Sequence, residues 1–242
     1  MKDAAALVMV LNDEYWLPYS LESTREYFDR YVIYDMGSTD KTTDVIDWFI
    51  QSNNSASFFV RKFKDIPSRE AQGAFRNAMI AEAKTEKFFL LDGDEVYSPY
   101  SLNLLVNEWN RFDKLYGVIR RIEVSKDLTK RYDKIRTHHR AYHRTAVFDG
   151  PHPGERLLIP QKESNEYNFK PEIICHHFHN AVRSSKENDA LKRSERKSQH
   201  TYHPGELIEY DLLKALPLLS KPILDFPVAP ELKKLQDDHN HI

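Results

Sequence analysis

The stretch KFFLLDGDEVYSP, residues 87–99, joins a short apolar run to three closely spaced acids. Residues 88–91 form a continuous apolar run, which is typical of a strand buried on both faces of a parallel sheet. Asp92, Asp94 and Glu95 follow within four positions. Acids this close together repel one another at a strand end unless a cation joins them. The stretch therefore predicts a buried strand that ends at a candidate cation site.

A helix is expected directly after these acids. Ser98 and Pro99 provide an N-cap and a first-turn proline. The apolar residues that follow recur at helical spacing, at Leu102, Leu105, Val106 and Trp109. The stretch thus predicts a strand, an acidic turn and a helix in succession.

The same strand-then-helix pattern occurs three times earlier in the chain. Strands are expected at 5–11, 30–35 and 57–63, and helices over 17–28, from Ser38 or Thr39 to Ile50, and over 68–84. Four alternations between residues 5 and 110 predict an α/β fold whose doubly wound, mostly parallel, Rossmann-like sheet has right-handed crossovers.

The second half of the chain has a different pattern. Strands are expected at 116–124 and 138–148 with no helix between them, which predicts a mixed half of the sheet. A polar helix is expected over 184–200, an amphipathic helix over 205–219 and a proline-punctuated tail over 221–242.

Composition excludes several classes of protein. The 242 residues suit one large domain, and a net charge of −2 argues against a nucleic-acid binder. Cys175 is the only cysteine, so the chain can form neither an intramolecular disulfide nor a cysteine-based zinc site. The sequence contains no apolar run of about 18 residues and no signal-peptide pattern, so we expect a cytoplasmic protein without a membrane span.

Polar residues follow each expected strand of the first half, namely residues 12–14, Asp35, residues 61–64 and residues 92–95. Ligands of open α/β sheets bind beyond the carboxyl ends of the strands. The chain has 7 glycines and no glycine-rich phosphate loop. A divalent metal would therefore be needed to neutralise the negative charge of a bound diphosphate. Asp92 and Asp94 flank Gly93 and can turn toward one ion. The alternative is a solvated acidic turn before the next helix.

Four segments together carry a family resemblance. They are VMVLNDEYWLPYSLEST (8–24), YVIYDMGSTDKT (31–42), RNAMIAEA (76–83) and FFLLDGDE (88–95). Their order and spacing resemble family 2-like glycosyltransferases of the GT-A fold, which have N-E after strand one, D-x-x-S-x-D-x-T after strand two, an arginine-bearing helix and a D-x-D after strand four. The resemblance covers about residues 5–100. It departs from the family pattern at residues 12–14, where Asp13 is inserted into the N-E pair.

The resemblance implies a metal-dependent inverting glycosyltransferase that moves a sugar from a nucleotide-diphosphate sugar, here a UDP-sugar, to the hydroxyl of a glycan or other acceptor. It implies one GT-A domain, with a donor-binding half at 1–110 and an acceptor-binding half with a C-terminal helical extension at 111–242. Mn²⁺ or Mg²⁺ is the implied cofactor. The implied donor-site residues are Leu11, Asn12, Asp35, Arg69, Arg76, Asp92 and Gly93.

Individual roles also follow from the resemblance. Asp35 would bond the base or ribose, and Arg76 or Arg69 would reach the base or diphosphate. Asp92 would face the ribose and the water shell of the metal. Asp94 would ligate the metal directly.

The stretch HRTAVFDGPHPGERLL (143–158) is similar to the acceptor-side segment of the family. An inverting transfer needs a group that takes the proton of the acceptor hydroxyl. Glu155 is the expected base, with Asp149 and His152 as alternatives. The competing interpretation is a surface turn at 149–151 with an exposed Glu155.

Three histidines end the apolar stretch IICHHFHNA (173–181). In a strand, His177 and His179 lie on one face and His176 on the other. Similar transferases often complete their metal site with a late histidine, and a neutral imidazole suits Mn²⁺. We therefore expect His177 and His179 to bind the metal together with Asp92 and Asp94. The basic segment 183–197 is either a lid over the diphosphate or a solvated helix face.

Two other functions remain open at this point. Asp92, Asp94 and the histidines at 176–179 would also suit a metal-dependent phosphohydrolase or nucleotidyltransferase. A non-catalytic relative that binds a nucleotide or glycan is the third possibility.

Overall fold

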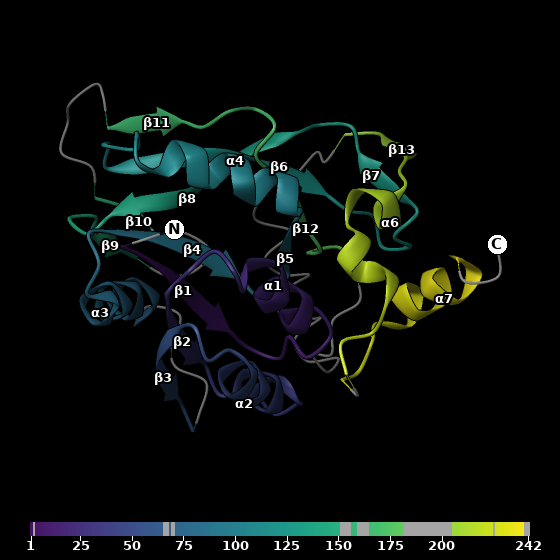
Figure 1. Cartoon of the computed structure of the whole chain (residues 1–242), viewed down its shortest axis with the longest axis horizontal. Coiled ribbons are helices and arrows are strands. Elements are labelled where there is room, and N and C mark those ends of the chain that lie inside the picture. Colours follow the sequence, from purple (N-terminus) through teal and green to yellow (C-terminus); the bar gives the residue numbers. More distant parts are fainter. Residues whose placement is uncertain are drawn as a thin grey trace.

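The computed structural model describes residues 1, 3–64, 68, 71–150, 156–158, 165–181, 205–224 and 226–239. In these residues a nine-stranded sheet is flanked by helices, as Figure 1 shows. The strand order is β3-β2-β1-β4-β8-β6-β12-β5, and β11 pairs with β6 beside this path.

The first half has the predicted alternation. Its parallel strands are β1 (Ala4–Val10), β2 (Arg30–Asp35), β3 (Ser57–Lys62) and β4 (Lys87–Asp92). Its helices are α1 (Leu17–Thr24), α2 (Thr42–Ser52), α3 (Gln72–Ala83) and α4 (Pro99–Trp109). Ser98 caps α4 as expected, because its hydroxyl accepts a hydrogen bond from the backbone N–H of Ser101. The expectation of an α/β fold with a mostly parallel first half is confirmed.

Strand β1 is buried on both faces of the sheet. Val8 and Val10 pack with residues of α1, α2 and α4 in one core cluster, whereas Ala5 and Leu7 pack with Met79 of α3 in another. Side chains of a strand point alternately to the two faces, so a continuous apolar run is needed when helices cover both. This explains why β1 has no polar position.

The second half is mixed, as the sequence predicts. Its main strands are β5 (Glu95–Tyr97), β6 (Tyr116–Glu123), β8 (Arg136–His143), β11 (Glu166–Asn168) and β12 (Ile174–His177). Strand β8 is antiparallel to both β4 and β6, while β12 is parallel to β6 and antiparallel to β5.

The connection from β4 to β5 positions the site. These strands are separated in sequence only by Gly93 and Asp94, yet β8, β6 and β12 lie between them in the sheet order. A sheet can meet this condition only by curling around the connection. The acidic turn is therefore surrounded by the ends of β6, β8 and β12.

The predicted amphipathic helix over 205–219 is wrong. The structure has instead a short strand β13 (Leu207–Glu209) paired with β7 (Lys130–Tyr132), then α6 (Leu212–Ala215) and a 3₁₀ helix, η2 (Pro217–Ser220). Asp211 begins α6 as its N-cap, and Pro217 has no N–H with which to continue an α-helix. The tail contains a further helix, α7 (Pro230–His239), which sequence reasoning missed. The expected polar helix at 184–200 lies outside the described residues.

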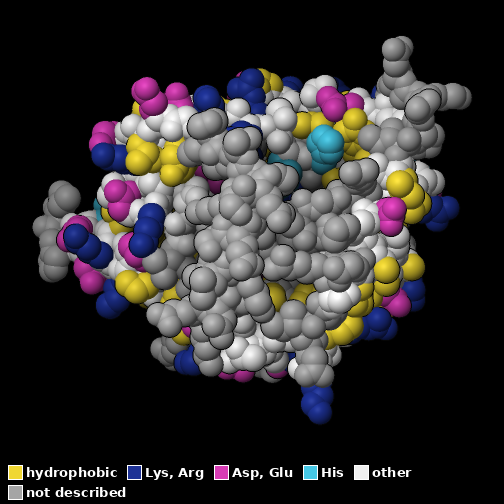
Figure 2. Space-filling view, turned by 180° about the vertical axis from the view of Figure 1, so that it is seen from behind, with side chains coloured by type: hydrophobic (Ala, Val, Ile, Leu, Met, Phe, Trp, Pro, Cys, Tyr) yellow, Lys and Arg dark blue, Asp and Glu magenta, His cyan; other side chains and the backbone are white. Residues whose placement is uncertain are grey.

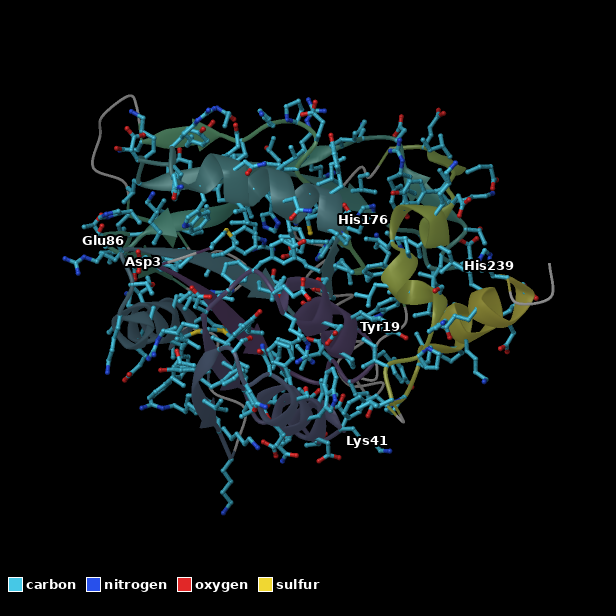
Figure 3. All side chains as sticks on the ribbon, viewed as in Figure 1. Asp3, Tyr19, Lys41, Glu86, His176 and His239 are labelled. Atoms are coloured by element: carbon cyan, nitrogen blue, oxygen red, sulfur yellow. The ribbon has the colours of Figure 1, made fainter. Side chains whose placement is uncertain are left out.

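The C-terminal segment packs against the end of α1. The hydroxyl of Tyr19 donates to the carbonyl of Lys221 at 3.3 Å, and Gln236 donates to the carbonyl of Leu219 at 2.8 Å. Figure 3 shows Tyr19 on the side of α1 that faces these helices. This segment shares a core cluster with Trp16 and Phe178, so it supports the region next to the histidines.

A second pair of short strands, β9 (Phe148–Asp149) and β10 (Arg156–Leu157), lies beside α3. On the described part of the face in Figure 2, acidic and basic side chains are interspersed rather than separated by sign, in keeping with the small net charge.

Within the described residues, each helix is too short or too polar to cross a bilayer.

Candidate functional site

The loops that follow β1 and β2 interlock through backbone and side-chain hydrogen bonds. The N–H of Asn12 donates to the Ser38 hydroxyl at 3.0 Å, and the N–H of Thr39 donates to Asn12 Oδ1 at 2.8 Å. The expectation that Ser38 or Thr39 caps α2 is therefore wrong, because both residues are used between the loops. Helix α2 begins at Thr42, whose hydroxyl accepts from the N–H of Asp13 at 2.8 Å.

Asp35 is 2% exposed at the end of β2. Its Oδ1 accepts the N–H of Ser38 at 2.9 Å, and its Oδ2 accepts the hydroxyl of Thr43 at 2.7 Å. Asp35 thus holds the loop and the start of α2. A further role toward a base or ribose stays a prediction.

Gly93 allows the acidic turn to approach the loop after β1. A Cβ at this position would lie 3.0 Å from both Asp13 Oδ2 and Val10 Cγ1, closer than packed atoms normally approach. A glycine is therefore needed where the two loops meet. Leu11, the other expected donor-side residue here, is half-buried and packs against the core cluster on the α3 face.

Asp92 is paired with two arginines from different elements. Arg140 of β8 lies 2.5 Å from Asp92 Oδ2, and Arg76 of α3 lies 3.7 Å from Oδ1. Burial alone would raise the pKa of Asp92, but the charges of Arg140 and Arg76 hold it far below its ordinary value. The structure thus gives the Asp92 carboxylate partners from the protein itself.

Arg140 also pairs with Glu95, which is fully buried. The Nε of Arg140 donates to Glu95 Oε1 at 3.0 Å. Sequence reasoning missed both roles. Arg140 lies in RTHHRAYH, a strand rich in polar residues, where a single arginine gives no signal of its distant partners.

The cluster that could hold a metal consists of Asp94, His177 and His179. Among the described residues, these three place one ligand atom each within 4.8 Å of one another. Nε2 of His177 lies 3.5 Å from Asp94 Oδ2, and the rings of His177 and His179 are stacked with centroids 5.4 Å apart. Of the four expected ligands, Asp94, His177 and His179 lie together, whereas Asp92 is outside this cluster and pairs with arginines.

Phe178 fixes these ligands in place. Its backbone N–H donates to the carbonyl of Asp94 at 2.9 Å, which ties the acidic turn to the histidine segment. Its ring stacks on Trp16 with a centroid distance of 4.0 Å. The apolar residue between the two histidines is therefore an anchor, and the imidazoles on either side of it stay next to Asp94.

Glu123 orients the ring of His177. Its Oε2 lies 2.8 Å from Nδ1 of His177, and a carboxylate can only accept, so Nδ1 carries the proton. Burial alone would raise the pKa of Glu123, but the hydrogen bond from His177 and the charge of Arg121 lower it to about 2. In the neutral imidazole, the lone pair of Nε2 then faces Asp94. Two electron-rich atoms facing each other fit a cation between them, and the donor set suits Mn²⁺.

His176 lies near α6, as Figure 3 shows. Its Nε2 is 2.6 Å from the hydroxyl of Tyr210, and burial lowers the pKa of His176 to about 4. The prediction that His176 and His177 face opposite ways is met, and His176 is outside the metal cluster.

The expected acceptor side is only partly described. Asp149 is an exposed residue of β9, and the N–H of Gly73 in α3 donates to the adjacent Gly150 carbonyl at 3.3 Å. His152, Glu155 and Arg69 lie outside the described residues, as does the basic segment 183–197.

Comparison with solved structures defines the class of fold. The structure of a mannosyltransferase from Pyrobaculum calidifontis, in complex with GDP-Man and Mn²⁺, matches 99% of this chain and 69% of that protein, with a TM-score of 0.51 and 14% identity. This match shows the GT-A fold that the sequence resemblance implies.

The family model for Glycosyl transferase family 2 matches residues 6–188. The chain belongs to this family, which confirms the resemblance.

Two further solved structures match less of the chain. TarS 1-349 of S. aureus in complex with UDP-GlcNAc has 19% identity and a TM-score of 0.42, with 50% of this chain and 35% of that protein covered. Glucosyl-3-phosphoglycerate synthase of Mycobacterium tuberculosis, in complex with Mn²⁺, UDP-Glc and phosphoglyceric acid, has 17% identity and a TM-score of 0.38, with 50% and 43% covered. This chain thus spans less than half of either protein. No curated protein matches it.

Proposed function

We propose that this chain is a metal-dependent inverting glycosyltransferase that moves a sugar from a nucleotide-diphosphate sugar to an acceptor hydroxyl. The observation that carries the proposal is the cluster of Asp94, His177 and His179, with ligand atoms within 4.8 Å of one another at the carboxyl end of β4. Family membership supports the transfer of a sugar, and the cluster supports its dependence on a metal.

Asp94, His177 and His179 would hold the cation, which is Mn²⁺ or Mg²⁺. When bound, the cation supplies positive charge against the diphosphate leaving group. Two imidazoles in the donor set favour Mn²⁺ over Mg²⁺, because Mg²⁺ prefers oxygen ligands. The ligands come from both predicted halves, since Asp94 follows β4 while the histidines belong to the end of β12 and the residues after it.

The proposed donor is a UDP-sugar, with its nucleotide beside the ends of β1 and β2. Asp35 would accept a hydrogen bond from the base or ribose, and Arg76 or Arg69 would reach the base or diphosphate. Arg76 is 5% exposed and already lies 3.7 Å from Asp92, so it is fixed near the acidic turn. Uridine as the base rests on the family resemblance alone.

The proposed base is Glu155, with Asp149 and His152 as alternatives. It would take the proton of the acceptor hydroxyl while that oxygen attacks the anomeric carbon from the side opposite the diphosphate. The Glu155→Gln variant should keep its affinity for Mn²⁺ and the donor but lose on the order of 10²–10⁴ in turnover. Near-normal turnover in this variant, together with its loss in Asp149→Asn or His152→Ala, would move the base to one of those residues.

A donor panel tests the proposal as a whole. The protein is incubated with UDP-, GDP- and CMP-sugars in Mn²⁺ and in EDTA, and the products are separated. Release of sugar and nucleoside diphosphate in Mn²⁺, lost in EDTA and in the Asp94→Ala variant, is expected. Release of nucleoside monophosphate would indicate the phosphohydrolase or nucleotidyltransferase alternative. Binding without turnover would indicate a non-catalytic relative, and full activity in EDTA would rule out metal dependence.

A further inference from the structure

We infer that Glu123 is a positioning residue: by accepting from His177 with one oxygen while Arg121 holds the other, it fixes the His177 tautomer whose Nε2 can bind a cation. This inference deepens the proposed function and rests on it. It concerns how the protein prepares a ligand before any metal arrives.

The fold places these three side chains together. Strand β6 pairs in parallel with β12, and Glu123 stands directly opposite His177 in the register. Arg121, two residues earlier, lies on the same face of β6. Glu123 is 1% exposed, so water cannot substitute for either of its partners.

The two oxygens of Glu123 have different neighbours, a hydrogen-bonded histidine at one and an arginine in an ion pair at the other. Oε2 lies 2.8 Å from Nδ1 of His177, and Oε1 lies 2.8 Å from Nε of Arg121. Arg121 is itself held from the other side, because its guanidinium lies 2.9 Å from Nδ1 of His138. The guanidinium thus keeps Glu123 from turning, and Glu123 keeps the His177 ring from turning.

Only a carboxylate serves both partners. Arginine has donors and no acceptor, and a carboxylate has acceptors and no donor. A glutamine at position 123 would have one oxygen and one NH₂ group. Since an NH₂ group facing the guanidinium would bring donors together, the amide oxygen would turn to Arg121 and the NH₂ group to His177.

The consequence for His177 is a change of tautomer. An NH₂ group facing Nδ1 requires Nδ1 to accept, so the ring proton moves to Nε2. That proton then occupies the lone pair that faces Asp94 at 3.5 Å. The Glu123→Gln variant would therefore keep the shape of the site and bind a metal more weakly. A residue that only fills space would be replaced by glutamine without this effect.

The test compares three variants with the natural chain. Glu123→Gln is the test variant, and Arg121→Met/Glu123→Gln is its rescue, because without the guanidinium the amide oxygen is free to turn to His177. Glu108→Gln is the matched control, since Glu108 is also buried and also pairs with a basic residue, Lys170, but lies on α4 outside the cluster.

Two measurements are made on each metal-free protein, at a pH high enough for the His177 ring to be neutral. Titration calorimetry with Mn²⁺ alone gives the metal affinity, and the ¹⁵N chemical shifts of the histidine ring nitrogens give the His177 tautomer. We expect Glu123→Gln to weaken Mn²⁺ binding by about 10–100-fold, the usual effect of losing an outer-shell partner, and to move the His177 proton to Nε2. The double variant should recover both properties, and Glu108→Gln should change neither.

The outcomes separate this inference from the proposed function. If the natural chain binds Mn²⁺ while Glu123→Gln binds it equally well with the proton still on Nδ1, Glu123 has no positioning role and the inference is overturned. A Glu123→Gln variant with weakened binding and an unchanged tautomer overturns it too. If the natural chain binds no Mn²⁺, the metal-dependent function fails and the role toward a metal fails with it, although the NMR shifts still decide whether Glu123 sets the tautomer.

Discussion

The loops after β1 and β2 and the turn after β4 are both rich in acids, but their carboxylates are neutralised by different means. In the loops, Asp35 and Glu14 accept backbone N–H groups and a hydroxyl from within the first half of the chain. In the turn, Asp92 and Glu95 pair with Arg140, which comes from the second half.

This difference separates two uses of an acid at a strand end. A carboxylate that accepts N–H groups at the start of a helix builds the loop and carries a charge that the backbone dipoles stabilise. A carboxylate buried against a distant arginine instead makes one half of the fold depend on the other. Asp94, between Asp92 and Glu95, belongs to a third kind, since it lies with His177 and His179 in a cluster that could hold a cation.

Removing Arg140 should have the largest effect on stability, because Asp92 and Glu95 of the acidic turn share this partner. The Arg140→Met variant leaves Asp92 and Glu95 without their shared cation in a buried site, so we expect unfolding to become easier by about 3–5 kcal/mol. Urea unfolding measures this loss. The matched control is Arg61→Met, which removes an arginine exposed on β3 and should cost far less. Equal losses in the two variants would show that the acidic turn does not depend on Arg140.

A side chain at position 93 should have the next largest effect. In Gly93→Ala the new Cβ would lie 3.0 Å from Asp13 and Val10, so the turn and the loop after β1 must separate. We expect a cost of about 1–3 kcal/mol in unfolding free energy, as for other overpacked sites, and weaker Mn²⁺ binding because Asp94 follows directly. Thermal unfolding and calorimetry check the two parts. A variant with natural stability would mean that the loops are not in close contact.

Asp35→Asn tests the loop side of the comparison. Asparagine can accept from Ser38 or Thr43 with only one oxygen, so we expect a loss of about 1–2 kcal/mol in unfolding free energy. If Asp35 also contacts the nucleotide, UDP affinity measured by calorimetry falls as well. Asp47→Asn, which changes an exposed partner of Lys62 on α2, is the control. Unchanged UDP affinity in a folded Asp35→Asn protein would limit Asp35 to its structural role.

His138 should give the smallest effect, through pH. Burial and the neighbouring Arg140 lower the pKa of His138 from 6.5 to about 4. The unfolded chain therefore binds a proton at this residue between these two values while the folded chain does not, so this residue makes stability fall as pH falls from 6.5 toward 4.

Replacing His138 by asparagine removes this one contribution. Between about pH 7 and about pH 6, the His138→Asn variant should lose roughly 0.5–1 kcal/mol less stability than the natural chain. Urea unfolding at both pH values measures the difference. A larger loss in the variant would mean that His138 is protonated in the folded state, paired with Glu95 at 3.5 Å.

The sequence by itself determined the first half of the fold and the family. Continuous apolar runs and helical spacing give β1 to β4 and α1 to α4 because these patterns are set by burial within each element. The order of the four motifs identifies the family, and the metal ligands predicted from this resemblance, which include Asp94, His177 and His179, stay a prediction. The predicted start of α2 is wrong because Ser38 and Thr39 form hydrogen bonds with Asn12 of the loop after β1. Capping preferences and apolar spacing do not predict such a contact between loops.

Only the tertiary structure decided the partners of the acids. Arg140, Glu123 and Arg121 lie on strands whose sequence shows no motif, and they reach the turn because β8, β6 and β12 intervene between β4 and β5. The prediction of one helix over 205–219 is wrong because β13 pairs with β7, a contact distant in sequence. Local propensity predicts whether one segment by itself favours a helix or a strand. Strand order and buried ion pairs instead depend on residues that only the folded chain brings together.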